Sequence, residues 1–202
     1  MGSTPRLVLA SASPRRRALL EQVGCVFETW PAAGVEGPRH VGESPIDYAR
    51  RSAEAKAAAV SCAAPDALVL GADTVVTVDG AVLGKPADAG EARQMLAALA
   101  GRSHWVHTGI SVAAAGEVLC SDVASTEVFF RPLSPDEIAA YVATGEPLDK
   151  AGAYGIQGRG AMLVEKIDGC YSNVVGLPLG RTRELLIAAD ERLKAGNGDG
   201  KC

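Results

Sequence analysis

The fold is decided near the N-terminus by the stretch Leu7-Val8-Leu9-Ala10-Ser11-Ala12-Ser13-Pro14-Arg15-Arg16-Arg17. Its first four residues form a short apolar run, which is typical of a strand inside a sheet. Ser13 followed by Pro14 predicts a helix start, because a hydroxyl caps the first turn and the proline ring has the φ that this turn needs. We therefore expect a buried strand, a turn of small residues and a helix that Gly24 ends.

Three arginines, residues 15–17, stand in the first turn of the predicted helix. Backbone N–H groups and the positive end of the helix dipole meet there, so cations at this place oppose the dipole. The arginines are either a solvated helix face or part of an anion site, to which guanidinium groups contribute planar donors. Their position makes an anion site, and a phosphate in particular, at least as well supported as a solvated face.

Length and composition allow one domain or two tightly joined lobes, since the chain has 202 residues and is 48% hydrophobic. The formal net charge of −4 argues against general nucleic-acid binding. The first twenty residues nevertheless hold four arginines and no acid, which suits a local anionic ligand. We expect a single catalytic domain over residues 1–194 and a flexible, glycine-rich tail over residues 195–202.

Cysteine usage and hydropathy predict a cytoplasmic protein that binds no membrane. The five cysteines form no C-x-x-C pair, which favours reduced thiols over a disulfide framework or a zinc knuckle. The apolar runs are too short to span a bilayer. The N-terminal apolar run is soon broken by Pro14 and the arginines, unlike a signal peptide.

Strand and helix patterns are mixed along the rest of the chain, which predicts an α/β to α+β fold with a twisted, mixed β-sheet flanked by helices. Apolar and β-branched runs predict strands at residues 26–30, 67–78, 105–113, 118–131 and 161–167. Helical periodicity predicts helices at residues 48–60, after a start signal at Ser44-Pro45, and at residues 182–194. Two more helices are predicted at residues 88–99, with Asp88 as the cap, and at residues 134–144, with Ser134 and Glu137 in capping-box spacing. Residues 146–160 form a long, glycine-rich loop in this interpretation, and loops of that length are often functional.

Asp73 is the strongest candidate for chemistry, because it interrupts an apolar strand beside Gly71. A carboxylate there is costly unless it is paired, bound to a metal or facing a cleft. Thr74-Val75-Val76 continues the strand pattern, which disfavours a turn aspartate. Near phosphates such a carboxylate can hold Mg²⁺ or deprotonate a water, and the pattern does not separate these roles.

Lys56, Lys85 and Gln157 are weaker candidates taken one at a time. Lys56 lies on an Ala-rich helix, where most lysines are solvated, and Lys85 follows a predicted hairpin, a better place for a phosphate partner. Gln157 offers a donor and an acceptor in Gly155-Ile156-Gln157-Gly158, which suits reading a base edge or simply a polar loop.

Other familiar site patterns are missing. His104 and His107 are three residues apart on a predicted strand, so they face opposite sides and do not suit a metal pair. The sequence contains neither a Walker phosphate loop nor a G-x-S-x-G nucleophile elbow. Phosphate binding would therefore have to come from the serine and arginine turn.

The sequence closely resembles the Maf family of nucleotide pyrophosphatases, once described as septum-formation inhibitors, from about Leu7 to Leu186. The resemblance rests on several blocks in the family's order: Leu9-Ala10-Ser11-Ala12-Ser13-Pro14-Arg15-Arg16, Gly71-Ala72-Asp73-Thr74-Val75-Val76, Leu83-Gly84-Lys85-Pro86, the run from Glu146 to Gly158, and Asn173-Val174-Val175-Gly176-Leu177-Pro178-Leu179. It implies an ITPase-like fold with two lobes around a nucleotide cleft, and a homodimer.

The resemblance implies hydrolysis of dTTP and UTP to the monophosphate and pyrophosphate with Mg²⁺ or Mn²⁺. Asp73 falls on the proposed proton acceptor of the family. The residues that match its substrate-binding positions are Ser11, Ser13, Arg15 and Arg16 on the phosphate turn, the basic residues Lys56 and Lys85, and Thr74 and Gln157, which with Arg15 are linked to substrate choice.

One departure concerns the metal. Many members have two consecutive acids after the second strand, where this chain has Glu36-Gly37. The expected metal ligands are Asp73 and Glu36, with Glu43 as a substitute for the missing acid. Gly37 also supports an alternative function, a nucleotide-binding regulator of cell division that does not hydrolyse. A pyrophosphatase for modified nucleotides such as 7-methyl-GTP is a further alternative, which Arg15 and Gln157 disfavour.

Overall fold

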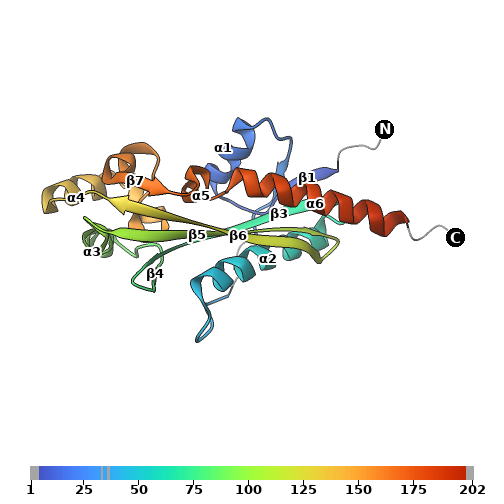
Figure 1. Ribbon diagram of the computed structural model, residues 1–202, viewed down its shortest axis with the longest axis horizontal. Helices are drawn as coiled ribbons and strands as arrows, with labels where there is room; N and C mark the ends of the chain where they lie inside the picture. The colour runs from blue at the N-terminus through green and yellow to red at the C-terminus, as the bar shows by residue number, and fades with distance from the viewer. Residues whose placement is uncertain (1–4, 33, 36, 199–202) are drawn as a thin grey trace. The chain divides into compact units, whose positions relative to one another are not determined.

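The computed structural model describes residues 5–32, 34–35 and 37–198 and contains a mixed β-sheet flanked by helices, as the sequence predicts (Figure 1). The sheet order is β2-β1-β3-β5-β6-β7, with β4 paired to β3. β1 is parallel to β2 and β3, whereas the β3–β4 and β6–β7 pairs are antiparallel. The strands of the described residues are β1 (Arg6–Leu9), β2 (Glu28–Thr29), β3 (Ala67–Val78), β4 (Ala81–Leu83), β5 (Ser103–Ala114), β6 (Glu117–Phe130) and β7 (Val164–Asp168).

Helices occupy most of the connections between these strands. The α-helices are α1 (Pro14–Gln22), α2 (Pro45–Ala63), α3 (Ala89–Leu99), α4 (Pro135–Val142), α5 (Tyr171–Val175) and α6 (Leu179–Gly198). Three short 3₁₀ helices lie between α4 and β7: η1 (Glu146–Asp149), η2 (Ala151–Ala153) and η3 (Gly158–Leu163). No helix in the described part of the chain is long and apolar enough to cross a membrane.

The chain forms two compact units. Unit 1 comprises residues 1–73, 108–124 and 176–202, and unit 2 comprises residues 74–107 and 125–175. Strands β3, β5 and β6 each contribute residues to both units. The boundary in β3 falls between Asp73 and Thr74, so the predicted site residues are distributed over both units.

In unit 1 the turn after β1 leads into α1 as predicted. Pro14 opens the helix, and the Ser13 hydroxyl accepts a hydrogen bond from the backbone N–H of Arg16. The helix ends at Gln22, and Gly24 follows with a φ of +72°, a conformation that glycine adopts at little cost. Short β1 is fully paired with β3, and its Val8 and Leu9 are buried.

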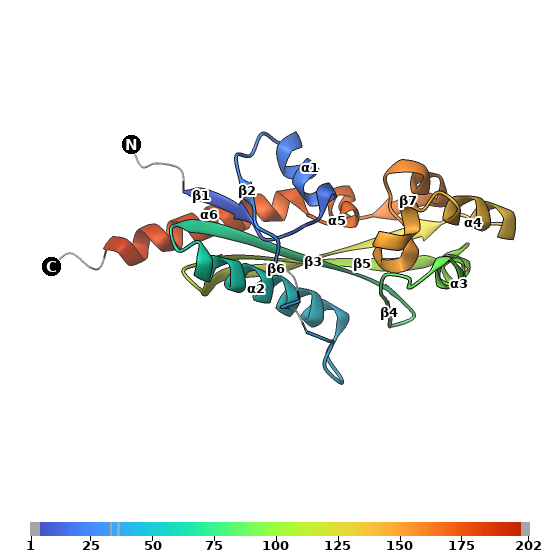
Figure 2. The same cartoon turned by 180° about the vertical axis from the view of Figure 1, so that it is seen from behind.

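Helix α2 packs its backbone closely against the sheet of unit 1. A Cβ built on Gly71 of β3 would lie 2.3 Å from the carbonyl oxygen of Ala53, and one on Gly109 of β5 would lie 2.2 Å from that of Ala49. Glycine at these two positions therefore lets the helix backbone approach the strands closely. Figures 1 and 2 show α2 on one side of the unit 1 sheet and α6 on the other.

Unit 2 has a core of its own, built by β-strand residues and two capped helices. The core includes Val76, Leu96, Val106 and Phe130, all nearly fully buried. Asp88 caps α3, and Ser134 and Glu137 form the predicted capping box of α4. These caps satisfy N–H groups that the first helical turn leaves without a backbone partner.

Several boundaries differ from the sequence-based prediction. The expected loop 146–160 is folded into η1, η2 and the start of η3, and β7 begins at Val164 rather than Ala161. β2 has only two residues, and α5 was not predicted. Helix α6 runs from Leu179 to Gly198, beyond the expected end at Lys194, and residues 199–202 of the expected tail lie outside the described residues.

Candidate active site

The site is centred where β1 ends beside its parallel neighbour β3, which continues past this point to Val78. Leu9 of β1 pairs with Leu70 of β3, and the backbone N–H of Ala10 donates to the Leu70 carbonyl at 2.8 Å. Ser11 follows directly on one strand, and Asp73 lies three residues further along the other. The end of a parallel strand that leads into a helix is a common place for ligands, because the helix N-terminus opens there.

Arg16 links the turn after β1 to the middle of β3. Its Nη1 donates to the Ser11 hydroxyl at 3.1 Å and to the Ala72 carbonyl at 2.9 Å, while its Nε donates to the Gly176 carbonyl at 2.8 Å. The Ser11 hydroxyl also accepts from the backbone N–H of Ser13 at 3.2 Å. Arg16 thus holds the residue before Asp73 against the serine turn, a structural role that the sequence did not indicate.

Lys56 of α2 reaches Asp73 of β3. The ammonium nitrogen lies 2.7 Å from Oδ1 of the carboxylate, and only 10% of the Lys56 side chain and 19% of the Asp73 side chain are exposed. Lys56 lies on the buried face of α2 that also carries Ala53, Ala57 and Val60. A lysine so buried needs a counter-charge, which the Asp73 carboxylate provides.

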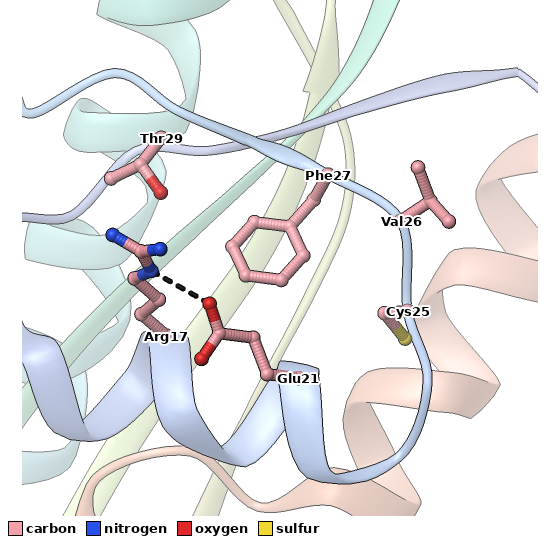
Figure 3. A pocket seen from close by; sticks show the side chains of 6 residues that line it. All are labelled: Arg17, Glu21, Cys25, Val26, Phe27 and Thr29. Carbon is pink, nitrogen blue, oxygen red and sulfur yellow. Dashed lines mark hydrogen bonds and ion pairs between the residues drawn. The ribbon is translucent and has the colours of Figure 1, made fainter.

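The remaining arginines of the turn differ in their surroundings. Arg15 is half-buried, whereas Arg17 is exposed and pairs with Glu21 on the same helix at 2.7 Å. Figure 3 shows this pair beside a cavity of about 470 Å³, which Phe27 and Thr29 line from the next segment. No predicted site residue lines that cavity.

Thr74, Lys85 and Gln157 belong to unit 2. Thr74 is half-buried in β3, Lys85 is exposed after β4, and Gln157 is exposed at the N-terminus of η3. The structure therefore gathers Ser11, Ser13, Arg16, Lys56 and Asp73 in unit 1. The functional roles of the residues in both units stay predictions.

A protein-built metal centre does not fit the described residues, which contain no group of three or more His, Cys, Asp or Glu side chains suited to an ion. The predicted ligand Glu36 lies outside the described residues. Asp73 alone fits a different arrangement, since Mg²⁺ in phosphate sites is held by one or two carboxylates together with substrate phosphates. The donor set therefore suits a cation that arrives with a polyphosphate.

Glu43, the suggested substitute metal ligand, is hydrogen-bonded to other residues of the protein. Its Oε1 and Oε2 accept from Nε and Nη2 of Arg51 at 2.7 and 2.9 Å, and Oε2 accepts from the backbone N–H of His40 at 2.9 Å. These hydrogen bonds lower the pKa of the Glu43 carboxyl to about 2. The bidentate pair with Arg51 joins the loop that carries Glu43 to α2. Because both carboxylate oxygens are already hydrogen-bonded, Glu43 is a poor metal ligand.

The two β5 histidines lie in separate environments, as strand alternation predicts. The His104 Nε2 lies 2.7 Å from the Tyr154 hydroxyl, whereas the His107 ring lies 2.7 Å from the Ser125 hydroxyl and 3.4 Å from that of Thr77. Burial lowers the pKa of both imidazoles, that of His104 to about 4. Both are therefore neutral core histidines at pH 7.

The sequence comparison identifies the family. Residues 6–189 match the family described as Maf-like protein. The chain belongs to the Maf-like protein family. Curated relatives named dTTP/UTP pyrophosphatase include that of Symbiobacterium thermophilum, 54% identical over 181 residues, and that of Moorella thermoacetica, 55% identical over 184 residues. These matches cover 90% of this chain and 92% and 93% of the respective relatives.

A further curated relative and a solved structure also resemble this chain. The dTTP/UTP pyrophosphatase of Yersinia pestis is 52% identical over 181 residues, covering 89% of this chain and 91% of the relative. Among solved structures, a HAM1 protein from Coxiella burnetii is 18% identical and covers 62% of this chain and 73% of its own, with a TM-score of 0.42. That likeness is too low to inform the function of this chain.

Proposed function

We propose that this protein hydrolyses dTTP and UTP to the nucleoside monophosphate and pyrophosphate. Family membership and several relatives at about 50% identity, which carry that activity in their names, support the proposal. The observation that carries it is the buried Lys56–Asp73 pair, with the residue before Asp73 hydrogen-bonded to the arginine of the serine turn. A general base, a buried cation and a helix N-terminus are the parts that phosphoryl chemistry needs.

In the proposed reaction a water oxygen attacks the α-phosphorus, and the bond from that phosphorus to the oxygen bridging to the β-phosphate breaks. Asp73 accepts the proton of the water, while the electron pair of the broken bond leaves with pyrophosphate. Lys56 orients the carboxylate through Oδ1 and adds positive charge beside the reacting phosphate. Because charge develops on phosphate oxygens, electrostatic stabilisation contributes most of the acceleration.

The phosphate contacts are proposed from residues at the first turn of α1. Ser11, Ser13 and Arg15 would bind phosphate oxygens together with backbone N–H groups. Arg16 would add charge to this site while holding Ser11 and the Ala72 carbonyl in place. In unit 2, Lys85 is a proposed phosphate partner, and Thr74 and Gln157 are proposed to take part in the choice of nucleotide.

We propose Mg²⁺ or Mn²⁺ as the cofactor, held by phosphate oxygens and Asp73, with Glu36 as a second ligand. When bound, the cation would neutralise part of the triphosphate charge and favour departure of pyrophosphate. Chelation of the metal should then abolish turnover without unfolding the protein. The described residues contain no group of three or more His, Cys, Asp or Glu side chains that could hold a structural ion. Circular dichroism before and after chelation separates the two effects.

Further features of the whole protein remain proposals. Residues 1–194 are proposed to act as one catalytic domain, with the protein as a homodimer in the cytoplasm. The cytoplasmic proposal rests on the cysteines, of which the four in the described residues are free thiols. Binding of nucleic acid or membrane is not proposed, given the net charge of −4.

The test is product analysis with a panel of nucleoside triphosphates, with Mg²⁺, Mn²⁺ or no metal. We expect pyrophosphate and monophosphate from dTTP and UTP. Asp73→Asn keeps the shape of the side chain but removes the base, so turnover should fall at least about 100-fold. Release of orthophosphate alone, or near-normal rates in Asp73→Asn with an intact fold, would refute the mechanism.

One observation favours the alternative of a regulator that binds nucleotide without hydrolysis. Gly37 stands where the family resemblance leads us to expect a second acid, and its φ of +60° lies in a region that side-chain-bearing residues rarely adopt. Nucleotide binding with no pyrophosphate release under any metal would select this alternative. Competition between UTP and 7-methyl-GTP tests the remaining one, a pyrophosphatase for modified nucleotides.

A further inference from the structure

Within unit 2, the segment that carries Gln157 is held by a carboxylate from an earlier turn. Glu146, the first residue of η1, accepts hydrogen bonds from the backbone N–H of Arg159 at Oε1 (3.2 Å) and from that of Gly160 at Oε2 (3.4 Å). These two N–H groups lie in the first turn of η3, where a helix has no backbone acceptors for them. Glu146 therefore acts as a cap for η3 from outside that helix.

Gln157 itself occupies the N-cap position of η3 but makes no capping hydrogen bond with its side chain. An N-cap side chain normally accepts from the N–H groups two and three residues later, which here are the groups bound by Glu146. The Gln157 side chain is exposed. Because Glu146 caps the helix, the donor and the acceptor of the Gln157 amide are available to a ligand.

The close contacts of this segment leave no room for a side chain at two of its glycines, Gly158 and Gly160. A Cβ on Gly158, whose φ is +65°, would lie 3.0 Å from Oε1 of Glu146. A Cβ on Gly160 would lie 2.1 Å from the Gly155 carbonyl oxygen and 2.7 Å from the Tyr141 hydroxyl. The glycines that flank Gln157 thus let Glu146 and Tyr141 approach the backbone of this segment closely.

The backbone before Gln157 is held by two tyrosines, and the hydroxyl of one of them, Tyr141, also hydrogen-bonds the Glu146 side chain. The Tyr141 hydroxyl accepts from the N–H of Gly155 at 3.3 Å, and Tyr154 is buried with its hydroxyl 2.7 Å from Nε2 of His104. Burial raises the pKa of the Tyr141 hydroxyl to about 12, so it stays protonated at every working pH. The backbone on both sides of Gln157 is therefore held by hydrogen bonds: that of Gly155 by Tyr141, and the first turn of η3 by Glu146.

Glu146 is itself well located for this role. Its backbone N–H donates to the Thr144 hydroxyl at 3.1 Å, and its carbonyl accepts from Nζ of Lys150 at 2.6 Å. The Lys150 side chain in turn lies against Gly155, since a Cβ on that glycine would be 2.8 Å from the Lys150 Cε. The carboxylate therefore starts from a backbone that hydrogen bonds already hold.

We propose that Glu146 is a positioning residue for substrate choice: its carboxylate fixes the Gln157 backbone so that the amide meets the edge of a pyrimidine-dione base. The proposal rests on the proposed function. Uracil and thymine present a carbonyl acceptor next to an N–H donor, which a carboxamide matches with its NH₂ and its oxygen. Prior fixing of Gln157 removes an ordering cost that would otherwise weaken binding.

A double-mutant cycle on Glu146 and Gln157 tests the proposal. Glu146→Ala should raise KM for dTTP and UTP about five- to tenfold, the size of a lost helix cap, with a smaller effect on kcat. It should also reduce the preference for UTP over CTP, because CTP has an amino group where UTP has a carbonyl. In a Gln157→Ala background, Glu146→Ala should add little, because it acts through Gln157.

Two further variants keep the cycle interpretable. Glu146→Gln retains one acceptor oxygen, so it should give intermediate KM values and serves if Glu146→Ala unfolds. Glu165→Gln is the matched control, because Glu165 is an exposed acid on β7 of the same unit, and it should leave KM unchanged. Thermal unfolding of each variant reports the structural cost separately.

The outcomes separate this proposal from the proposed function. Turnover of dTTP and UTP by the wild type supports the function, and a non-additive cycle with altered base preference then supports the positioning role. Equal effects of Glu146→Ala in both backgrounds, or an unchanged UTP to CTP preference, would overturn the positioning role alone. A wild type that turns over neither nucleotide would overturn both.

Discussion

At the residue scale, the central feature is a lysine that the sequence alone would leave in solvent. The repeated alanines of α2 suggest a featureless helix, yet Lys56 lies on the face buried against β3 and pairs with Asp73. A buried ion pair contributes little net stability, since both charges lose hydration. Its presence is consistent with the proposed role of Lys56 in supplying charge beside a phosphate.

We predict that Lys56→Met, which keeps the methylene chain and removes the charge, lowers kcat for UTP about 100-fold. The free energy of unfolding should fall by about 2 kcal/mol, because Asp73 loses its partner but remains partly hydrated. Steady-state kinetics and urea unfolding measure the two effects. Lys194→Met is the control, because Lys194 pairs with Asp190 at an exposed site on α6, and both quantities should stay near wild type.

At the scale of elements, two sets of contacts hold α2 in place: its backbone packs against the sheet, and its Arg51 binds the loop before it. The first depends on Gly71 and Gly109, where any side chain would overlap the helix backbone. The second depends on Arg51, which binds Glu43 by two hydrogen bonds and the Pro38 carbonyl at 3.0 Å. Since α2 carries Lys56, both contacts position the site indirectly.

Gly71→Ala should lower the free energy of unfolding by about 3 kcal/mol, because the added methyl would overlap the Ala53 carbonyl and force the helix away. Chemical denaturation checks this. The control is Gly180→Ala in α6, where a Cβ meets nothing within 4 Å and alanine is the better helix former. Equal stability of the two variants would show that α2 is not in close contact with the sheet.

The Glu43–Arg51 contact predicts a pH dependence of stability. The pKa of Glu43 is lowered from 4.5 to about 2 in the folded protein, so its contribution is complete above about pH 4.5 and is lost as the pH falls towards 2. The stability difference between wild type and Glu43→Gln should therefore be constant at neutral pH and shrink below pH 4.5. Denaturation at a series of pH values measures it, and a difference that grows in acid would contradict the contact.

Local rules predicted the elements whose signals are contiguous in sequence. The caps at Ser13, Asp88 and Ser134 are all present, and β3 has the predicted bounds. The prediction of a loop over residues 146–160 was wrong. The structure of this segment depends on the Glu146 carboxylate, which accepts a hydrogen bond from the backbone of Arg159, thirteen residues later in the chain. Hydrogen bonds of this kind, from a side chain to a distant backbone group, produce no periodic pattern in the sequence.

At the scale of the whole molecule, the sequence resemblance and the family match agree over nearly the entire chain. The fold class and the family were therefore predictable from sequence. The carbonyl contacts of Arg16 and the cap supplied by Glu146 were not, because they join residues distant in sequence through geometry. The net charge of −4 together with a basic first turn remains the simplest whole-chain indication of a small anionic substrate.

The most direct test of the account follows the oxygen of water during UTP hydrolysis. The reaction is run in water enriched in heavy oxygen, and the products are separated and analysed by mass spectrometry. Attack at the α-phosphorus predicts the label in UMP and none in pyrophosphate, with at least about 100-fold less labelled UMP from Asp73→Asn in the same time. Label in pyrophosphate, or in orthophosphate released with UDP, would contradict the assignment of this protein as a pyrophosphatase that acts at the α-phosphorus.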